Sequence, residues 1–214
     1  MTPTISVIMA VHNQAEYLPS AVKSILKQSF VNFEFIIIDD ASDDKATIDF
    51  LKHLIDPRII LISHPKRQGL AKSLNLALNK ARGEFIARMD ADDIALPARF
   101  AKQINFLNQH PKIAVCGTAA ILIDKFGKTI GRKLYPVNIT SAILIRFNPI
   151  IHPTATIRKS VLNKLGGYDE TLNGAEDYDL WLRIASKYPL VNLSSPLIKY
   201  RLKPEGISWA RLKH

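Results

Sequence analysis

Acidic residues gather at three places in the sequence, and their types and spacing could bind a cation or move a proton. Asp39 and Asp40 follow one apolar run, residues 90–93 follow another, and Glu176 and Asp177 come after a glycine-containing loop. Two carboxylates at one site either share a proton or hold a cation. Oxygen ligands suit a hard ion such as Mg²⁺ or Mn²⁺, with water and phosphate oxygens completing its shell.

The stretch "MDADD" is the strongest candidate for a metal site. Asp90 and Asp92 are two residues apart, and in an extended chain such side chains point the same way, so both could ligate one ion. We expect this ion to bridge to a diphosphate. The alternative is that one or two of these acids cap the helix expected near Pro97 or pair with Arg99.

Glu176 and Asp177 open a predicted helix at 175–188. Acids in the first turn complement the helix dipole, and Asp179 can pair with Arg183 one turn later. Glu176 and Asp177 remain side by side after the glycine loop, where one of them could act as a base toward a hydroxyl group.

Alternating strands and helices must position these acids. Apolar runs typical of strands buried on both faces occur at 4–11, 33–40, 58–63 and 84–90, and helical spacing occurs at 14–28, 44–55, 70–81 and 97–109. This alternation predicts a parallel sheet covered on both sides. Ligands of such sheets sit beyond the carboxyl ends of the strands, where the first two acid clusters fall.

The regular alternation of strands and helices ends after about residue 110. We expect strands at 113–123 and 127–136, a helix at 139–147, a strand at 152–159, the helix at 175–188 and a last strand at 196–202. No linker separates the two parts. The sequence therefore predicts one domain over 1–214, with a nucleotide-type first half at 1–109 and a mixed second half at 110–214.

Composition limits the classes of protein that this chain can be. With 214 residues and 47% hydrophobic content, it can form one substantial core. The single cysteine, Cys116, excludes an intramolecular disulfide, and its apolar surroundings predict a buried thiol. The N-terminus lacks a basic leader, and no run reaches the roughly 18 apolar residues of a membrane span. We expect a cytoplasmic protein, free or peripheral at the inner face of the plasma membrane.

The net charge of +10 is concentrated in the second half. Residues 1–107 carry 13 Lys/Arg and 12 Asp/Glu, whereas residues 108–214 carry 16 and 7. A basic half could face nucleic acid, anionic lipid or a phosphorylated substrate, or be an ordinary solvated surface. Aromatic residues are not interleaved with the basic ones as a single-strand binding surface requires, which disfavours nucleic acid.

In their order and with their neighbours, the three clusters resemble glycosyltransferase family 2. The resemblance runs from "SVIMAVHNQAEYLPS" through "GLAKSLNLALNKARGEFIARMDADDIALPARF" to "GGYDETLNGAEDYDLWLRIA" and "KYRL", which is nearly the whole chain. The sequence around these motifs is similar to that of bacterial enzymes that build exopolysaccharide and lipopolysaccharide. The resemblance implies an α/β fold of GT-A type, a Rossmann-like nucleotide-diphospho-sugar transferase with a central, mostly parallel mixed sheet flanked by helices.

The resemblance also implies roles for individual residues. It places the nucleotide sugar against Ala10, Val11, His12, Asn13, Asp40, Lys72, Asp90 and Ala91. Asp92 would ligate Mn²⁺ or Mg²⁺ together with Asp90, while Asp39 and Asp93 would brace their turns. A solvated helix face explains Lys72 equally well.

By the same resemblance, residues 1–109 form the nucleotide-sugar-binding half and residues 110–214 the acceptor-binding half. Asp177 would be the catalytic base, and Glu176 would orient the acceptor or the loop. The donor would be a nucleoside diphosphate sugar, expected to be UDP-linked, and the acceptor a hydroxyl of a saccharide or of a polyprenyl-diphosphate-linked sugar. A single displacement would invert the anomeric centre. The basic half would then contact an anionic membrane.

Three positions carry open alternatives. Many relatives have a histidine just after the terminal "YR" pair, and this chain has Lys203 nearby, which can neutralise phosphate but cannot ligate a metal while protonated. His152 either contacts the acceptor or is hydrogen-bonded in a loop before proline. Trp181 either stacks on a sugar or belongs to the core.

Two other functions compete with sugar transfer. A sugar nucleotidyltransferase should carry a Gly-rich phosphate loop after the first strand, and "AVHNQAEY" has no glycine there. A catalytically degenerate nucleotide-sugar-binding protein is the third candidate, because Lys203 departs from the family pattern.

Overall fold

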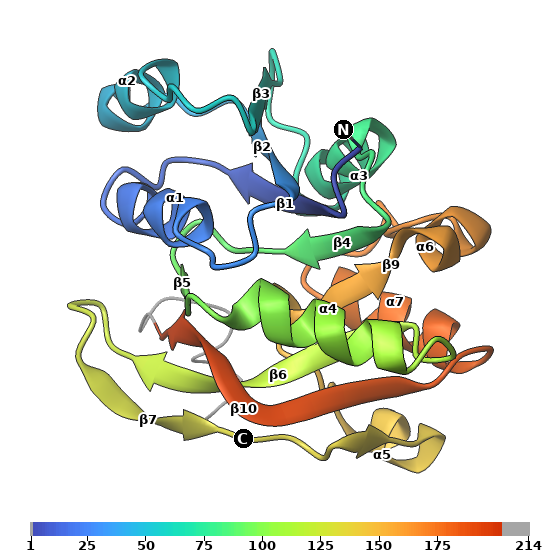
Figure 1. Cartoon of the computed structure of the whole chain (residues 1–214). Coiled ribbons are helices and arrows are strands. Elements are labelled where there is room, and N and C mark those ends of the chain that lie inside the picture. The colour runs from blue at the N-terminus through green and yellow to red at the C-terminus, as the bar shows by residue number, and fades with distance from the viewer. Residues whose placement is uncertain (1, 203–214) are drawn as a thin grey trace.

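The computed structural model of the chain describes residues 2–202 (Figure 1). Its strands are β1 (Ile5–Val11), β2 (Phe33–Asp39), β3 (Ile59–Ser63), β4 (Phe85–Arg88), β5 (Ile94–Ala95), β6 (Val115–Ile123), β7 (Thr129–Lys133), β8 (Asn138–Ile139), β9 (Thr156–Arg158) and β10 (Leu190–Arg201). Its helices are α1 (Leu18–Leu26), α2 (Lys45–Lys52), α3 (Leu70–Lys80), α4 (Arg99–Gln109), α5 (Ser141–Arg146), α6 (Lys159–Leu165) and α7 (Glu176–Ala185), with a 3₁₀ turn at His152–Thr154.

All strands belong to one mixed sheet. Its order is β3-β2-β1-β4-β9-β6-β10-β5, with β7 paired to β6 and β8 to β10. The longest pairings, β6 with β10 and β1 with β2, are parallel. The structure therefore confirms the expected α/β class, with a mixed central sheet flanked by helices.

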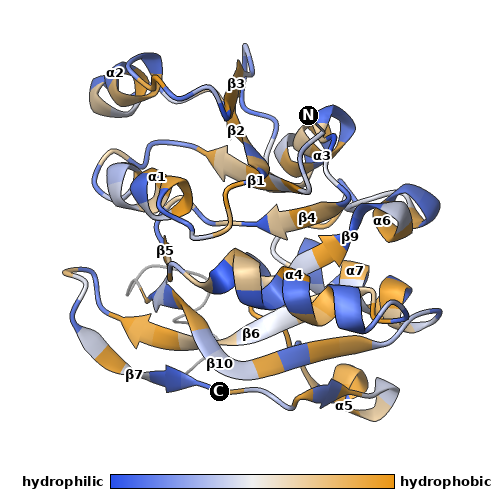
Figure 2. Cartoon of the chain, in the orientation of Figure 1, coloured by the Kyte–Doolittle hydropathy of each residue, from blue (hydrophilic) through white to orange (hydrophobic). Residues whose placement is uncertain are grey.

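Continuous apolar runs account for the first half of the sheet. In β1, Val7 and Met9 belong to the same core cluster as residues of α1 and α4, while Ile8 clusters with residues of α3. Helices α1 and α4 carry both hydrophobic and hydrophilic residues, as expected of helices that cover one face of a sheet (Figure 2). A strand between two layers of helices must be apolar at every position, which is why these runs do not alternate. The four predicted strands and four helices of this half are confirmed.

The second half joins this sheet through an antiparallel strand. β9 lies between β4 and β6 and pairs antiparallel with both. The predicted strand at 152–159 is wrong in part, because a 3₁₀ turn occupies His152–Thr154 and only Thr156–Arg158 is extended. Helix α6, which follows at once, was not predicted.

The ends of two predicted strands also differ in the structure. β10 starts at Leu190, six residues before the predicted strand at 196–202, and the pairing register shifts on both sides of Pro196. Proline within a run suggests a break, but a bulge tolerates it because no ladder hydrogen bond is needed there. β4 ends at Arg88, so the acids at 90–93 lie in a turn.

Two expectations from composition can be compared with the structure. Cys116 is fully buried, and burial raises the pKa of its thiol to about 12, so the thiolate is disfavoured. Within residues 2–202, no helix combines the length and the apolar character that crossing a membrane requires.

Candidate active site

One large cavity brings the two halves of the chain together. Its volume is about 750 Å³, and it is lined by Asp90 from the turn after β4 and by Glu176 and Asp177 from the first turn of α7. His152 and Asn148 lie on the same wall. Acids that are 86 residues or more apart in the sequence therefore face one space.

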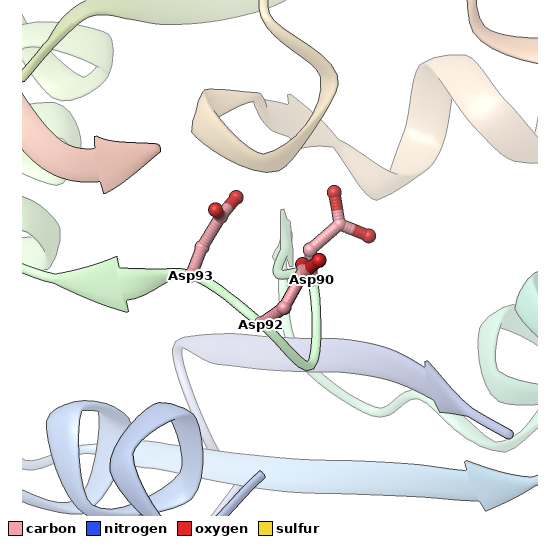
Figure 3. A group of neighbouring side chains, drawn as sticks. All are labelled: Asp90, Asp92 and Asp93. Carbon is pink, nitrogen blue, oxygen red and sulfur yellow. The ribbon is translucent and has the colours of Figure 1, made fainter. Parts of the chain in front are cut away.

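The turn after β4 gathers three carboxylates rather than two. Oxygen atoms of Asp90, Asp92 and Asp93 lie within 4.8 Å of one another, and their side chains project from one turn (Figure 3). The expected reason, alternation along an extended strand, is wrong, because the chain turns at Ala91 and Asp92. The turn itself produces the convergence.

Asp93 contributes a buried oxygen to this group. Its Oδ1 accepts the main-chain N–H of Arg201 at 2.8 Å, and its Oδ2 is buried without a hydrogen-bond partner. Burial, and then the negative charges of Asp92 and Asp90, hold the pKa of Asp93 well above its usual range. Such an oxygen is costly to bury alone, and three hard oxygen ligands at this spacing fit a divalent cation.

Asp90 is also the partner of a buried arginine. The guanidinium of Arg88, at the end of β4, forms an ion pair with Asp90, and its side chain is only 3% exposed. Arg88 lines the cavity, and its Nε is buried without a hydrogen-bond partner. The pair holds Asp90 at the boundary between the cavity and the acid turn.

The two alternatives for these acids were capping of the helix near Pro97 and pairing with Arg99. The first residues of α4 have no side-chain cap, so the helix-capping alternative is wrong. Arg99 is fully buried and donates to the main-chain oxygen of Arg88 and to Gln103. The ion pair of Asp90 is therefore made by Arg88 instead of Arg99.

Asp177 is held on both of its carboxylate oxygens. Oδ2 accepts from Nδ2 of Asn148 at 2.8 Å, and Oδ1 accepts from the main-chain N–H of Tyr178 at 2.8 Å. Burial raises the pKa of Asp177, although the bond from Asn148 lowers it in part. A half-buried carboxyl with a raised pKa in a cavity suits a proton acceptor.

The neighbouring acids of α7 differ in their surroundings. Glu176 is buried at the cavity wall. Asp179 forms the predicted ion pair with Arg183 at 2.8 Å, one turn along the helix. Asp179 is thus a structural residue of α7.

His152 and Trp181 lie together but only one reaches the cavity. His152 lines it, and its Nε2 is 2.9 Å from the hydroxyl of Tyr168. Burial, and then the charge of Arg88, lower the pKa of His152, so its ring is neutral. Trp181 is 0% exposed and packs edge-on against His152, so it offers no surface to a sugar and the core alternative describes it.

The predicted nucleotide turn lies at the end of β1. Nδ1 of His12 is 3.0 Å from the main-chain oxygen of Asp40, and Oδ1 of Asn13 accepts the N–H groups of Asp43 and Asp44. Asn13 adopts a positive φ of 52°, which an asparagine tolerates in a turn. Ala10 and Val11 are the last residues of β1.

Asp40 joins this turn to the start of α3. Its carboxylate accepts the N–H groups of Gln68 at 2.7 Å and Gly69 at 2.9 Å. Leu70, the next residue, lines the cavity. As predicted, Asp39 orders its turn by accepting the N–H of Ser42.

The remaining predicted residues fall in different places. Lys72 is exposed on α3, and Ala91 is buried in the acid turn. Of the predicted nucleotide-sugar residues that the structure describes, only Asp90 lines the large cavity. Lys203 lies outside the described residues.

Three residues of the site were not predicted from the sequence. Arg88 was read as part of an apolar strand, and only its charge within that strand signals a special role. Asn148 has no local signal, because its partner Asp177 is 29 residues away. Arg201 donates from Nε to the main-chain oxygen of Asp92 at 2.8 Å, so it fastens β10 to the acid turn.

The model of glycosyl transferase family 2 matches residues 6–166. The chain is 37% identical to the putative glycosyltransferase EpsE of Bacillus subtilis, over 93% of this chain and 73% of that protein. It is 39% identical to the O-antigen biosynthesis glycosyltransferase WbnJ of Escherichia coli, over 92% and 79%.

A more distant relative has a fully described activity in its name. The chain is 29% identical to the UDP-Glc:alpha-D-GlcNAc-diphosphoundecaprenol beta-1,3-glucosyltransferase WfgD of Escherichia coli, over 98% of this chain and 81% of that protein. That name describes a UDP-linked donor and a lipid-linked acceptor.

The fold is shared with solved structures. A crystal structure of TarS from S. aureus in complex with UDP-GlcNAc superposes with a TM-score of 0.76 at 23% identity, over 95% of this chain. This chain spans 59% of that one. The likeness confirms the GT-A type of α/β fold.

Proposed function

The chain belongs to glycosyl transferase family 2, and from this membership and the cavity we propose that it transfers a sugar from a nucleoside diphosphate sugar to a hydroxyl group. One observation carries the proposal: Asp90 and Asp177, from opposite halves of the chain, line the same cavity of about 750 Å³. A donor beside Asp90 and an acceptor beside Asp177 would share this space. The relatives' names support a role in bacterial surface polysaccharide synthesis.

Asp177 serves in this proposal as the catalytic base. As the acceptor oxygen bonds to the anomeric carbon and the bond to the diphosphate breaks, the hydroxyl proton passes to Asp177. Attack from the face opposite the leaving group inverts the anomeric centre. Burial brings the pKa of this carboxyl closer to neutrality, which improves a base that must still be ionised. Glu176, beside it on the cavity wall, is proposed to orient the acceptor.

Asp90, Asp92 and Asp93 are proposed to hold Mn²⁺ or Mg²⁺. Their converging oxygens and the unpartnered Oδ2 of Asp93 fit such an ion. When bound, the ion would neutralise negative charge on the departing diphosphate. Arg88 keeps Asp90 in place and supplies a further positive charge at the cavity wall.

The nucleotide is proposed to lie against the end of β1 and the acid turn. The residues proposed for this role are Ala10, Val11, His12, Asn13, Asp40, Lys72, Asp90, Ala91 and Lys203. Two observations support it: Asp40 is fastened to the start of α3, and Leu70 of that helix lines the cavity. The uridine-linked donor of WfgD supports UDP as the nucleotide.

On the acceptor side we propose a saccharide or a polyprenyl-diphosphate-linked sugar. His152 lines the cavity and, with its neutral ring, could hydrogen-bond to an acceptor hydroxyl. The lipid-linked acceptor in the name of WfgD and the basic second half of this chain support this choice. Action at the cytoplasmic face of the membrane follows from such an acceptor.

The proposal is tested by Asp177→Asn, with Asp179→Asn on the same helix turn as the matched control. We expect Asp177→Asn to lower sugar transfer about 10²–10⁴-fold, because the positioned base is lost. Binding of UDP with Mn²⁺, measured by calorimetry, should persist. The control should retain transfer, since Asp179 pairs with Arg183 away from the reacting atoms.

A panel of UDP-, GDP- and TDP-linked sugars with soluble acceptor glycosides supplies the assay. Wild-type transfer that Asp177→Asn leaves unchanged would remove Asp177 from the role of base. Tight UDP binding with no transfer from any donor would point instead to the degenerate nucleotide-sugar-binding protein.

A further inference from the structure

The edge of the molecule formed by β7 and α5 exposes many apolar side chains. Within residues 2–202, six of the eleven exposed large hydrophobic residues lie in this segment: Phe126, Ile130, Leu134, Val137, Ile145 and Phe147. Phe126 is 82% exposed and Ile145 is 79% exposed. β7 and α5 lie along one margin of the molecule (Figure 1), and we call residues 125–147 the β7–α5 rim. An apolar surface gathered in this way marks an interaction site.

The rim carries positive charge and no negative charge. Residues 125–168 contain eight Lys/Arg and no Asp or Glu. Within the rim the basic residues are Lys125, Lys128, Arg132, Lys133 and Arg146, and all but Lys133 are exposed. Apolar and basic side chains on one surface match the interface of a bilayer, where anionic headgroups lie next to hydrocarbon.

The hairpin tip between β6 and β7 is built to present Phe126. Oδ1 of Asp124 accepts the N–H groups of Phe126 and Lys128, both at 2.9 Å, and Gly127 supplies the positive φ of 85° that the turn requires. Nζ of Lys125 lies 4.9 Å from the centroid of the Phe126 ring. The turn is closed from within, so the aromatic ring and its lysine neighbours point outward.

The rim is continuous with the large cavity. Lys133, Tyr135 and Phe147 all line it, and the rings of Tyr135 and Phe147 stack with centroids 5.8 Å apart. A molecule that lay in a membrane under the rim would therefore reach the cavity past these three residues.

We propose that the β7–α5 rim docks the protein on an anionic lipid bilayer, with the mouth of the cavity at the membrane surface. In this proposal the surface serves to deliver a lipid-linked acceptor to the cavity, and that use rests on the proposed function. Docking itself requires only the exposed apolar and basic side chains, so the two can fail separately.

Co-sedimentation with vesicles tests the docking. The vesicles are phosphatidylcholine alone, or phosphatidylcholine with roughly one quarter phosphatidylglycerol. A charge variant carries Lys128→Gln, Arg132→Gln and Arg146→Gln, and an apolar variant carries Phe126→Ser and Ile145→Ser. Matched controls at the opposite end of the sheet carry Lys45→Gln, Lys52→Gln and Lys66→Gln, or Ile55→Ser, since these residues are also exposed.

We expect the wild type to bind the anionic vesicles and to release them as salt rises, because surface charges are screened beyond about 10 Å at 0.1 M salt. Each removed rim charge should lower the partition coefficient about fivefold. The apolar variant should also bind less, while both controls should bind like the wild type. Circular dichroism checks that every variant is folded.

Three outcomes would overturn the docking: equal recovery of the wild type with both kinds of vesicle, equal losses in rim and control variants, or rim variants that bind unchanged. A dimer that the rim variants dissociate in light scattering, without vesicle binding, would assign the rim to a second copy of the chain. Hydrolysis of UDP-glucose and UDP-GlcNAc with Mn²⁺ in vesicle-free solution is measured alongside. It should be unchanged in the rim variants, and its absence in the wild type would count against the proposed transfer but not against docking.

Discussion

Asp90 and Asp92 differ in what a substitution at each would disturb. Asp90→Asn removes the ion-pair partner of the buried Arg88 as well as a proposed metal ligand. We expect it to cost about 1–3 kcal/mol of stability, because a buried charge loses its partner and Asp90 itself is partly exposed. A loss of activity in this variant would therefore have two causes.

Asp92→Asn gives a cleaner test of the metal. It relieves repulsion on the buried carboxyl of Asp93, so the metal-free protein should keep or slightly raise its melting temperature. The rise in melting temperature that Mn²⁺ produces in the wild type should disappear, since a ligand stabilises only the state that binds it. A full Mn²⁺ response in Asp92→Asn would exclude this aspartate as a ligand.

Asn148 is a positioning residue for Asp177, and its effect should be visible in the pH profile. Its hydrogen bond lowers the pKa of a carboxyl that burial raises, so Asn148→Ala should raise that pKa further. A base works only when ionised, so the acid limb of kcat/KM should move to higher pH, with the rate recovering as pH rises. Asn163→Ala, an exposed asparagine on α6, should leave the limb in place. If the acid limb of the Asn148→Ala profile stayed at the wild-type pH, the hydrogen bond from Asn148 would not set the pKa of Asp177.

At the scale of elements, β10 fastens the acid turn through its last residue. Arg201 donates from Nε to Asp92 and from Nη1 to the main-chain oxygens of Asp124 and Lys125. We expect Arg201→Lys to lose most of these bonds, to destabilise the protein by about 1–3 kcal/mol and to weaken Mn²⁺ binding several-fold. Thermal unfolding and calorimetry measure the two effects.

Arg183→Lys is the matched control for Arg201→Lys. Arg183 also pairs with main-chain oxygens, those of Leu165 and Gly167, but it lies on α7 away from the acid turn. A similar loss of stability with unchanged Mn²⁺ binding is expected. Equal effects of the two substitutions on Mn²⁺ binding would mean that Arg201 acts only through general stability.

The sequence predicted elements well where the signal is local. The runs that became β1 and β2 are apolar at nearly every position because helices cover both faces, and no other part of the chain is needed to see it. β9 is different, since three residues gain their extended conformation from pairing with β4 and β6. The predicted last strand began at Pro196, whereas β10 also includes the six residues before it, which gain their extended conformation from pairing with β6 and β8.

The candidate site shows the same difference between features visible locally in the sequence and features created by the fold. The clusters at 90–93 and 176–177 were visible as residues, whereas the partners that set their properties were not. Arg88 and Asn148 act through contacts that the fold creates, and Asp93 joins its neighbours because a turn replaces the end of the predicted strand. The roles of the individual site residues stay predictions.

At the scale of the whole molecule, we propose that the two halves unfold as one domain. Within residues 2–202, β9 lies in the sheet between the first four parallel strands and β6 and is paired on both sides, and β5 of the first half pairs with β10. Trp181 is fully buried in α7, so the change in its fluorescence on unfolding reports on the second half, while circular dichroism reports on all helices. The two signals should give the same urea midpoint. Separate midpoints would show two independently folding units.

The position of β9 also decides which parts of the chain can be exchanged. A chimera that took everything after α4 from a relative would replace a strand in the middle of the sheet and would have to re-form its pairing with β4. Residues 124–148 lie between β6 and β9 in the chain and contain only the short strands β7 and β8, which pair with β6 and β10, so a graft of this segment would spare the central strands. Since this segment also supplies Tyr135, Phe147 and Asn148 to the cavity wall, exchanging it between relatives is the direct way to test whether it sets which acceptor the cavity takes.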